Sequence, residues 1–189
     1  AQPYFKSGRI QVVGNPIRLG ILEGGNQGAA RSAFSLDPAR PTLLITGASQ
    51  GAKAINDVLM LSIVKLAEKF QIIHQCGQTN FPEVNAQMLT IVKEGAKSYG
   101  LKVQENYRLY PSLDLKEMAL AYAACDLVVS RSGSIIFEIA AVGKPAVVIP
   151  LKNSAANHQF LNAREAAKFG AVIIEEDNLT PSIFINEIS

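Results

Sequence analysis

The chemically most informative residues lie between Asp126 and Pro150. The turn Ser132-Gly133-Ser134 follows an apolar run and precedes a short helical pattern that begins near Ile135. Backbone N–H groups at a helix N-terminus attract anions because they lack intrahelical acceptors. Glu138 lies about one helical turn further on, within reach of a second group on the same ligand. Backbone amides followed by a carboxylate suit a nucleotide, with the diphosphate on the amides and the ribose hydroxyls on the acid.

A second polar group follows the next apolar run. Asn157, His158 and Gln159 begin a predicted helix, and Asn162 lies one turn later. Amide and imidazole groups offer both donors and acceptors, which sugar hydroxyls require. The alternative is a polar first turn in which Asn157 caps the helix.

Two further segments are ambiguous by themselves. Gly47-Ala-Ser-Gln-Gly-Ala52 links a strand to a helix, and its small residues would let a ligand approach the backbone near Ser49 and Gln50. It could equally be a tight turn with Ser49 as helix cap. Arg18 is either a surface cation or a partner for a phosphate.

Several kinds of site are not indicated. The two histidines, His74 and His158, have no carboxylate pair at metal-ligand spacing, and the chain contains no Asp-x-Asp pair. We expect His74 to orient a loop or to lie satisfied near the sheet edge. Cys76 and Cys125 are interpreted as reduced, buried thiols. No nucleophile elbow or Walker phosphate loop occurs, so we predict no metal and no cofactor.

The elements that must position these residues alternate between short apolar strands and amphipathic helices. Strands are predicted at 42–46, 71–75, 101–107, 126–130, 145–150 and 171–175, and helices at 51–70, 82–99, 115–124, 135–142, 157–169 and from 180. This order predicts an α/β fold with a Rossmann-like parallel sheet and helices on both faces. Ligands of such sheets bind at the carboxyl ends of the strands. That rule selects residues 47–52, 74–77, 131–135, 151–159 and the loop before Leu115.

Composition supports one globular domain of moderate charge. The chain has 189 residues, of which 48% are hydrophobic and 18% charged, with a net charge of +2. This charge gives no indication of nucleic-acid binding. We expect no membrane span and no signal peptide. The first residues do not resemble a natural start, so we interpret the chain as a piece of a longer protein. Residues 1–20 would end a preceding domain and hinge, 21–41 would be a linker, and 42–189 would form a nucleotide-sugar-binding domain.

The motifs also occur together, in order, in a known family. They are Gly14-Asn-Pro-Ile-Arg18, Gly47-Ala-Ser-Gln-Gly-Ala52, His74-Gln-Cys-Gly77, Glu117-Met-Ala-Leu-Ala-Tyr-Ala-Ala-Cys-Asp126, Arg131-Ser-Gly133 with Glu138, and His158-Gln159 with Asn162-Ala163. Their order resembles the MurG family of bacterial N-acetylglucosaminyltransferases. The resemblance covers nearly the whole chain but only the second half of the family's length.

The resemblance implies a function and a set of roles. The chain would be the C-terminal half of a two-domain GT-B glycosyltransferase and would bind UDP-N-acetylglucosamine. By this resemblance, Glu138 would bind the ribose hydroxyls. The diphosphate would be contacted by Ser132, Gly133, Ser134, Ile135 and the region of Ser49 and Gln50. Arg18 would lie near the nucleotide at the hinge, and the backbone of Leu115 would read the uracil edge. Gln159, with His158 and Asn162 nearby, would hold the sugar.

The resemblance further implies the reaction and its place. The transfer would be inverting and metal-independent, converting lipid I to lipid II in peptidoglycan synthesis. The catalytic residues and the surface for the lipid-linked acceptor would belong to the N-terminal domain, so this chain would contain no catalytic residue and would be inactive alone. The enzyme would be cytoplasmic and peripheral on the inner face of the plasma membrane.

The sequence departs from the family pattern at two positions and is compatible with two other functions. Gly133 and Glu138 are one residue closer than is usual in the family, so either the turn absorbs a rotation of about 100° or Glu138 points elsewhere. Ala48 replaces a glycine, a mild change. The chain could also be a stand-alone nucleotide-sugar-binding subunit of a two-chain glycosyltransferase. A UDP-N-acetylglucosamine 2-epimerase-like protein is the other alternative.

Overall fold

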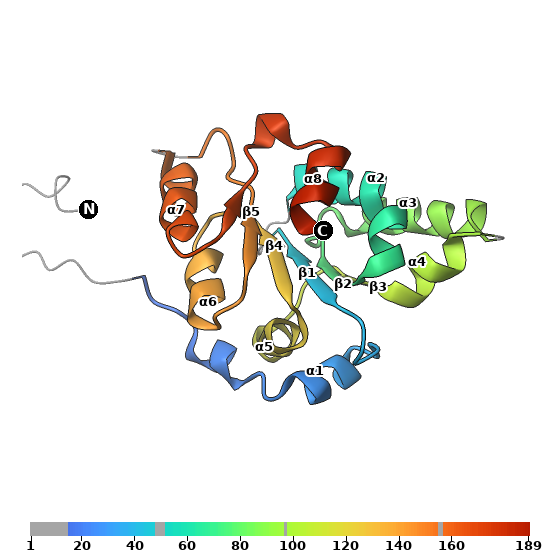
Figure 1. Ribbon diagram of the computed structural model, residues 1–189, viewed down its shortest axis with the longest axis horizontal. Coiled ribbons are helices and arrows are strands. Elements are labelled where there is room, and N and C mark those ends of the chain that lie inside the picture. Colours follow the sequence, from blue (N-terminus) through green and yellow to red (C-terminus); the bar gives the residue numbers. More distant parts are fainter. Residues whose placement is uncertain (1–14, 48–51, 97, 155–156) are drawn as a thin grey trace, which may run out of the picture.

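The structure is a computed structural model that describes residues 15–47, 52–96, 98–154 and 157–189. These residues form a six-stranded sheet in the order β3-β2-β1-β4-β5-β6 (Figure 1). Every neighbouring pair is parallel. The strands are β1 Thr42–Thr46, β2 Gln71–Gln75, β3 Tyr107–Tyr110, β4 Leu127–Ser130, β5 Ala146–Val148 and β6 Val172–Ile173. The predicted Rossmann-like α/β fold is confirmed.

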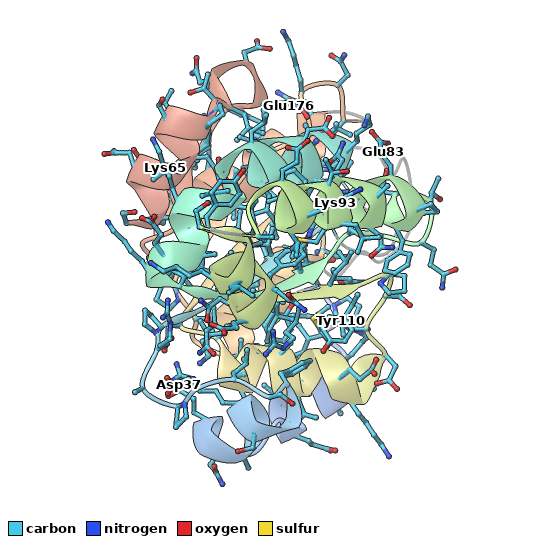
Figure 2. All side chains as sticks on the ribbon, turned by 90° about the vertical axis from the view of Figure 1, so that its right-hand side faces the viewer. Asp37, Lys65, Glu83, Lys93, Tyr110 and Glu176 are labelled. Atoms are coloured by element: carbon cyan, nitrogen blue, oxygen red, sulfur yellow. The ribbon has the colours of Figure 1, made fainter. Side chains whose placement is uncertain are left out.

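Helices cover both faces of the sheet (Figure 1). One layer contains α2 Lys53–Lys69, α3 Phe81–Glu94, α4 Gly100–Asn106 and α8 Pro181–Ile188; the other contains the 3-10 helix η2 Leu19–Glu23, α1 Gln27–Ala33, α5 Leu115–Ala124, α6 Ile135–Ala141 and α7 His158–Ala167. Figure 2 shows the layers from the side, with Glu83 and Lys93 on α3 and Asp37 on the opposite side of the sheet. Because strand side chains alternate, Ile45 packs in the first layer and Leu44 in the second. The sheet is therefore buried on both faces.

The predicted strand at 101–107 is wrong. Residues Gly100–Asn106 form α4, and only Tyr107 of that span begins β3. The alternation of apolar residues suggested a strand, yet Leu101 is exposed and Val103 is fully buried. Asn106 lies one helical turn after Val103 and donates Nδ2 to the carbonyl of Ala67 in α2 at 3.0 Å. The side chains of α4 are buried against α2 and α3, and this packing stabilises the helix over the strand. Local periodicity does not reveal such packing.

The segment interpreted as a linker is folded onto the domain. It holds the end of η2 and all of α1, and both pack against α5. The buried Arg31 of α1 donates to the carbonyl of Ala124 at 3.1 Å and to Oδ2 of Asp126 at 2.6 Å. The same Asp126 oxygen accepts the backbone N–H of Thr42 at 2.7 Å, at the start of β1. Arg31 thus fixes this segment to the end of α5 and to Asp126, which precedes β4 and in turn bonds to the start of β1. The domain limits at residues 20 and 41 remain predictions.

His74 joins β2 to its neighbours through a buried polar network. Its Nδ1 is 2.6 Å from the hydroxyl of Tyr107 in β3, and its Nε2 is 3.0 Å from Oδ1 of Asn56 in α2. Burial lowers the pKa of His74 to about 3, so the ring is neutral near pH 7. The prediction of a satisfied histidine near the sheet edge is confirmed, because β2 is the neighbour of the edge strand β3.

The two cysteines are free and buried, as the sequence predicted. Burial raises the pKa of the Cys125 thiol to about 12, which keeps it protonated. A protonated, inaccessible thiol is a structural side chain, not a nucleophile.

Candidate functional site

The strand order alone predicts where a ligand-binding crevice lies at the end of the sheet. The chain runs outward in one direction from β1 through β2 to β3, and in the other from β4 through β5 to β6. β1 and β4 are therefore the switch point, and their carboxyl ends are paired at Thr46 and Ser130. Open α/β sheets bind ligands outside the strand ends at such a point.

A cavity of about 430 Å³ opens at this end of the sheet. Its walls come from the segments after β2, β3 and β4, from α5 and from the residues before η2. The lining residues in the described part of the chain are Arg18, Gln75, Gln78, Ser112, Leu113, Met118, Ser134, Ile135 and Glu138. The volume is in the range of small-molecule sites.

Glu138 of α6 is the central polar group of this cavity. Arg18 donates Nε to Oε1 at 2.7 Å and Nη2 to Oε2 at 3.0 Å, a bidentate ion pair. The Tyr122 hydroxyl of α5 donates to Oε2 at 3.4 Å. The hydrogen bond from Arg18 to Glu138 raises the pKa of the guanidinium, and burial raises the pKa of the Tyr122 phenol. Both donors therefore keep their protons and remain able to donate hydrogen bonds to the carboxyl group of Glu138.

The short spacing from Gly133 to Glu138 does not turn the acid away from the cavity. Helix α6 begins at Ile135, directly after Ser134, and both residues line the cavity together with Glu138. Three and four residues separate Glu138 from these two positions, which is the spacing of one helix face. Glu138 therefore faces the cavity, and its contact with a ribose stays a prediction.

Three of the predicted site residues form a second cluster beside the cavity. Ser132 is buried and donates its hydroxyl to the carbonyl of Gln159 at 2.8 Å, while Asn162 donates Nδ2 to the carbonyl of Ser132 at 3.0 Å. The side-chain oxygen of Gln159 accepts the N–H of Leu151 at 3.0 Å. These bonds fasten the start of α7 to the loops after β4 and β5. The amide nitrogen of Gln159 and the amide oxygen of Asn162 make no hydrogen bond to the described residues, so each keeps a group for a ligand.

The remaining predicted site residues lie around these two groups. Gly133 has open space where a Cβ would be, and His158 is exposed at the start of α7. Leu115 is the first residue of α5, so its N–H has no intrahelical acceptor, and it stands between the lining residues Leu113 and Met118 in sequence. Ser49 and Gln50 lie outside the described residues.

Some lining residues were not singled out from the sequence. Gln75, Gln78, Ser112 and Leu113 fall in or beside the loops that the strand-end rule selected, but no role was assigned to their side chains, although Gln75 lies in the motif His74-Gln-Cys-Gly77. Tyr122 does not line the cavity but bonds to Glu138, and no role was assigned to it although it lies in the motif from Glu117 to Asp126. Its spacing of four residues from Met118 was the available signal, since both then lie on one helix face.

The profile of the glycosyltransferase family 28 C-terminal domain matches residues 42–189. The chain belongs to this family. The first residue of the matched span is the first residue of β1, so the family 28 domain contains the whole sheet and the helices from α2 to α8, while η2 and α1 precede it.

Similar proteins support this membership. Two curated relatives are named UDP-N-acetylglucosamine--N-acetylmuramyl-(pentapeptide) pyrophosphoryl-undecaprenol N-acetylglucosamine transferase. The one from Treponema denticola is 34% identical over 180 residues, covering 94% of this chain and 44% of the relative. The one from Flavobacterium psychrophilum is 36% identical over 182 residues, covering 94% and 45%. The chain thus spans a little under half the length of these relatives.

A solved structure shares the fold. The crystal structure of Acinetobacter baumannii MurG matches with a TM-score of 0.66 and 29% identity, covering 89% of this chain and 46% of that protein. The predicted resemblance to the MurG family and the placement in one half of a GT-B fold are confirmed.

The described residues contain neither a cluster of metal ligands nor a helix that could span a membrane. No group of three or more His, Cys, Asp or Glu side chains within them lies close enough together to hold a metal ion. None of the helices in that part of the chain is long and apolar enough to span a membrane.

Proposed function

We propose that this chain is the UDP-N-acetylglucosamine-binding domain of an inverting, metal-independent glycosyltransferase that converts lipid I to lipid II in peptidoglycan synthesis. The observation that carries the proposal is the cavity at the β1–β4 switch point of a family 28 domain, lined by one carboxylate and one guanidinium. The names of the relatives supply the donor and the acceptor class.

The donor fits the chemistry of the cavity. Glu138 would accept hydrogen bonds from the two ribose hydroxyls, which a carboxylate can take on its two oxygens. Arg18 and the backbone of Gly133, Ser134 and Ile135 would face the diphosphate. The N–H of Leu115 would donate to an acceptor on the uracil edge.

The sugar would extend toward the second cluster. Gln159 and Asn162 each keep one amide group for a hydroxyl, and the exposed His158 lies beside them. Because their other amide groups are bound to Leu151 and Ser132, the orientation of both side chains is fixed before the donor arrives. Pre-oriented donors and acceptors lower the entropy cost of holding a flexible sugar.

Metal independence follows from how the leaving group is neutralised. The diphosphate carries the charge that develops as the bond to the anomeric carbon breaks. Arg18 and the backbone amides would stabilise that charge directly, a task that Asp-bound metal ions perform in other enzymes. The sequence has no Asp-x-Asp pair for such a metal. We propose that no cofactor is required.

The chain would act together with an N-terminal acceptor domain. That domain would supply the catalytic base and would bind the lipid-linked acceptor, and we assign no catalytic residue to the present chain. Through it the enzyme would lie on the cytoplasmic face of the plasma membrane as a peripheral protein.

The proposal is tested by binding and by turnover. Titration calorimetry should show UDP and UDP-N-acetylglucosamine binding to this chain without divalent metal, and EDTA should leave the affinity unchanged. The complete protein should transfer N-acetylglucosamine to a lipid I analogue and release UDP. A metal requirement for binding would contradict the proposal, and production of N-acetylmannosamine with no acceptor present would identify an epimerase instead.

Tyr122→Phe should weaken UDP binding about two- to fivefold. The substitution removes the hydroxyl that bonds to Oε2 of Glu138 at 3.4 Å, a long hydrogen bond of modest strength. Isothermal titration of the variant measures the change. Tyr110→Phe is the control, because the Tyr110 hydroxyl makes no hydrogen bond to the described residues. Equal affinities in all three proteins would show that Tyr122 does not position the carboxylate.

A further inference from the structure

The carboxylate that the donor's ribose needs is already occupied in this structure. Both oxygens of Glu138 accept hydrogen bonds from Arg18, and one also accepts from Tyr122. A carboxylate offers about four lone-pair positions, of which these bonds take three. A ribose diol would need two.

The positions of the partners decide which bonds a ligand must break. The side chain of Glu138 is only 10% exposed, whereas that of Arg18 is 52% exposed. Tyr122 is buried beneath the acid. Arg18 therefore covers the solvent-facing edge of the carboxylate, and a ribose that approaches from the cavity must displace it.

Arg18 has no second anionic partner in the cavity unless a ligand supplies one. Among the described lining residues, Arg18 and Glu138 are the only charged side chains. Moving the guanidinium away from Glu138 would leave it without an anion. A phosphate restores the pairing, because guanidinium binds phosphate and carboxylate with the same bidentate geometry.

We propose that Arg18 makes ribose binding at Glu138 conditional on a phosphate, so that the domain selects nucleotides over nucleosides by an exchange of ion-pair partners. The inference rests on the proposed function, since it takes Glu138 as the ribose site. A nucleoside must break the Arg18–Glu138 pair without compensation. A nucleoside diphosphate breaks the same pair and provides Arg18 with a new anion in the same step.

The test compares uridine and UDP on the wild-type chain and on Arg18→Met. The variant keeps the aliphatic length of the side chain and removes its charge. We expect uridine to bind the variant about three- to tenfold more tightly than the wild type, because its competitor is gone. UDP should bind the variant no more tightly, so the preference for UDP over uridine falls by at least the same factor of about three to ten. NMR shift titration measures the weak nucleoside affinities.

Lys116→Met is the matched control. Lys116 is an exposed cation on α5, two residues from the lining residue Met118, so this change tests the loss of one nearby charge without loss of the ion pair. Its preference for UDP should match the wild type.

The outcomes separate this inference from the proposed function. If Glu138→Gln weakens UDP binding but Arg18→Met leaves uridine affinity unchanged or lower, the partner exchange is wrong and the ribose site stands. If UDP fails to bind the wild type, or binds Glu138→Gln equally well, both are overturned.

Discussion

Glu138→Gln should weaken UDP binding about tenfold or more. Gln has the shape of Glu but no charge, and one of its two terminal groups is a donor that cannot accept from a ribose hydroxyl. Hydrogen bonds to a charged group are worth roughly 1.5–3 kcal/mol, which corresponds to a factor of about ten to a hundred in affinity. Because the substitution also frees Arg18 from its partner, we expect the lower part of this range. Titration calorimetry with UDP measures the effect.

The control is the same change one helix away. Glu117 accepts the backbone N–H of Asp114 in the capping box of α5, and Gln supports a capping box equally well. Glu117→Gln should keep the wild-type affinity. Thermal unfolding of Glu138→Gln checks that the fold is intact, which we expect because Arg18 can be solvated at 52% exposure. Unchanged UDP affinity in a folded Glu138→Gln protein would reject the ribose role of this acid.

The fold was predictable where local pattern and burial agree. The strand at Thr42–Thr46 is continuously apolar at its centre and continuously buried, and Asp114 with Glu117 marks the start of α5 by capping alone. Residues 101–107 show the limit. Their alternating pattern fits a strand. They form a helix because they pack against α2 and α3, whose residues are distant in sequence.

The site residues that could be predicted are those that lie in a sequence motif or in a loop at the carboxyl end of a strand. Glu138 and the turn before it follow from spacing, and the strand-end rule selects the loops that contribute Gln75 and Ser112. The pairing of Arg18 with Glu138 could not be predicted, because 120 residues separate the partners and a lone arginine resembles any surface cation. The same holds for Tyr122, whose role depends on the hydrogen bond that its hydroxyl in α5 donates to Glu138 in α6.

The stability of the domain should fall below pH 6.5 because of His74. In the unfolded chain this histidine has a pKa of about 6.5, whereas burial lowers its pKa in the folded protein to about 3. Above pH 6.5 both states hold a neutral ring and the residue contributes no pH dependence. Between the two values only the unfolded state takes up a proton. The free energy of unfolding therefore decreases by about 1.4 kcal/mol per pH unit, or about 2 kcal/mol between pH 6.5 and 5.

Urea unfolding at pH 7 and pH 5 isolates this contribution when the wild type is compared with His74→Gln. Gln can still bond to Tyr107 and Asn56 but does not titrate. Between pH 7 and pH 5 the free energy of unfolding of His74→Gln should therefore fall by about 2 kcal/mol less than that of the wild type. His158→Gln is the matched control, because it removes the other histidine of the chain and leaves the His74 network intact. If His74→Gln does not fold, NMR of the wild-type ring gives the same information. A ring that takes up a proton in the folded state near pH 6 would contradict the argument, since Nδ1 of a charged imidazole could no longer accept a hydrogen bond from the Tyr107 hydroxyl.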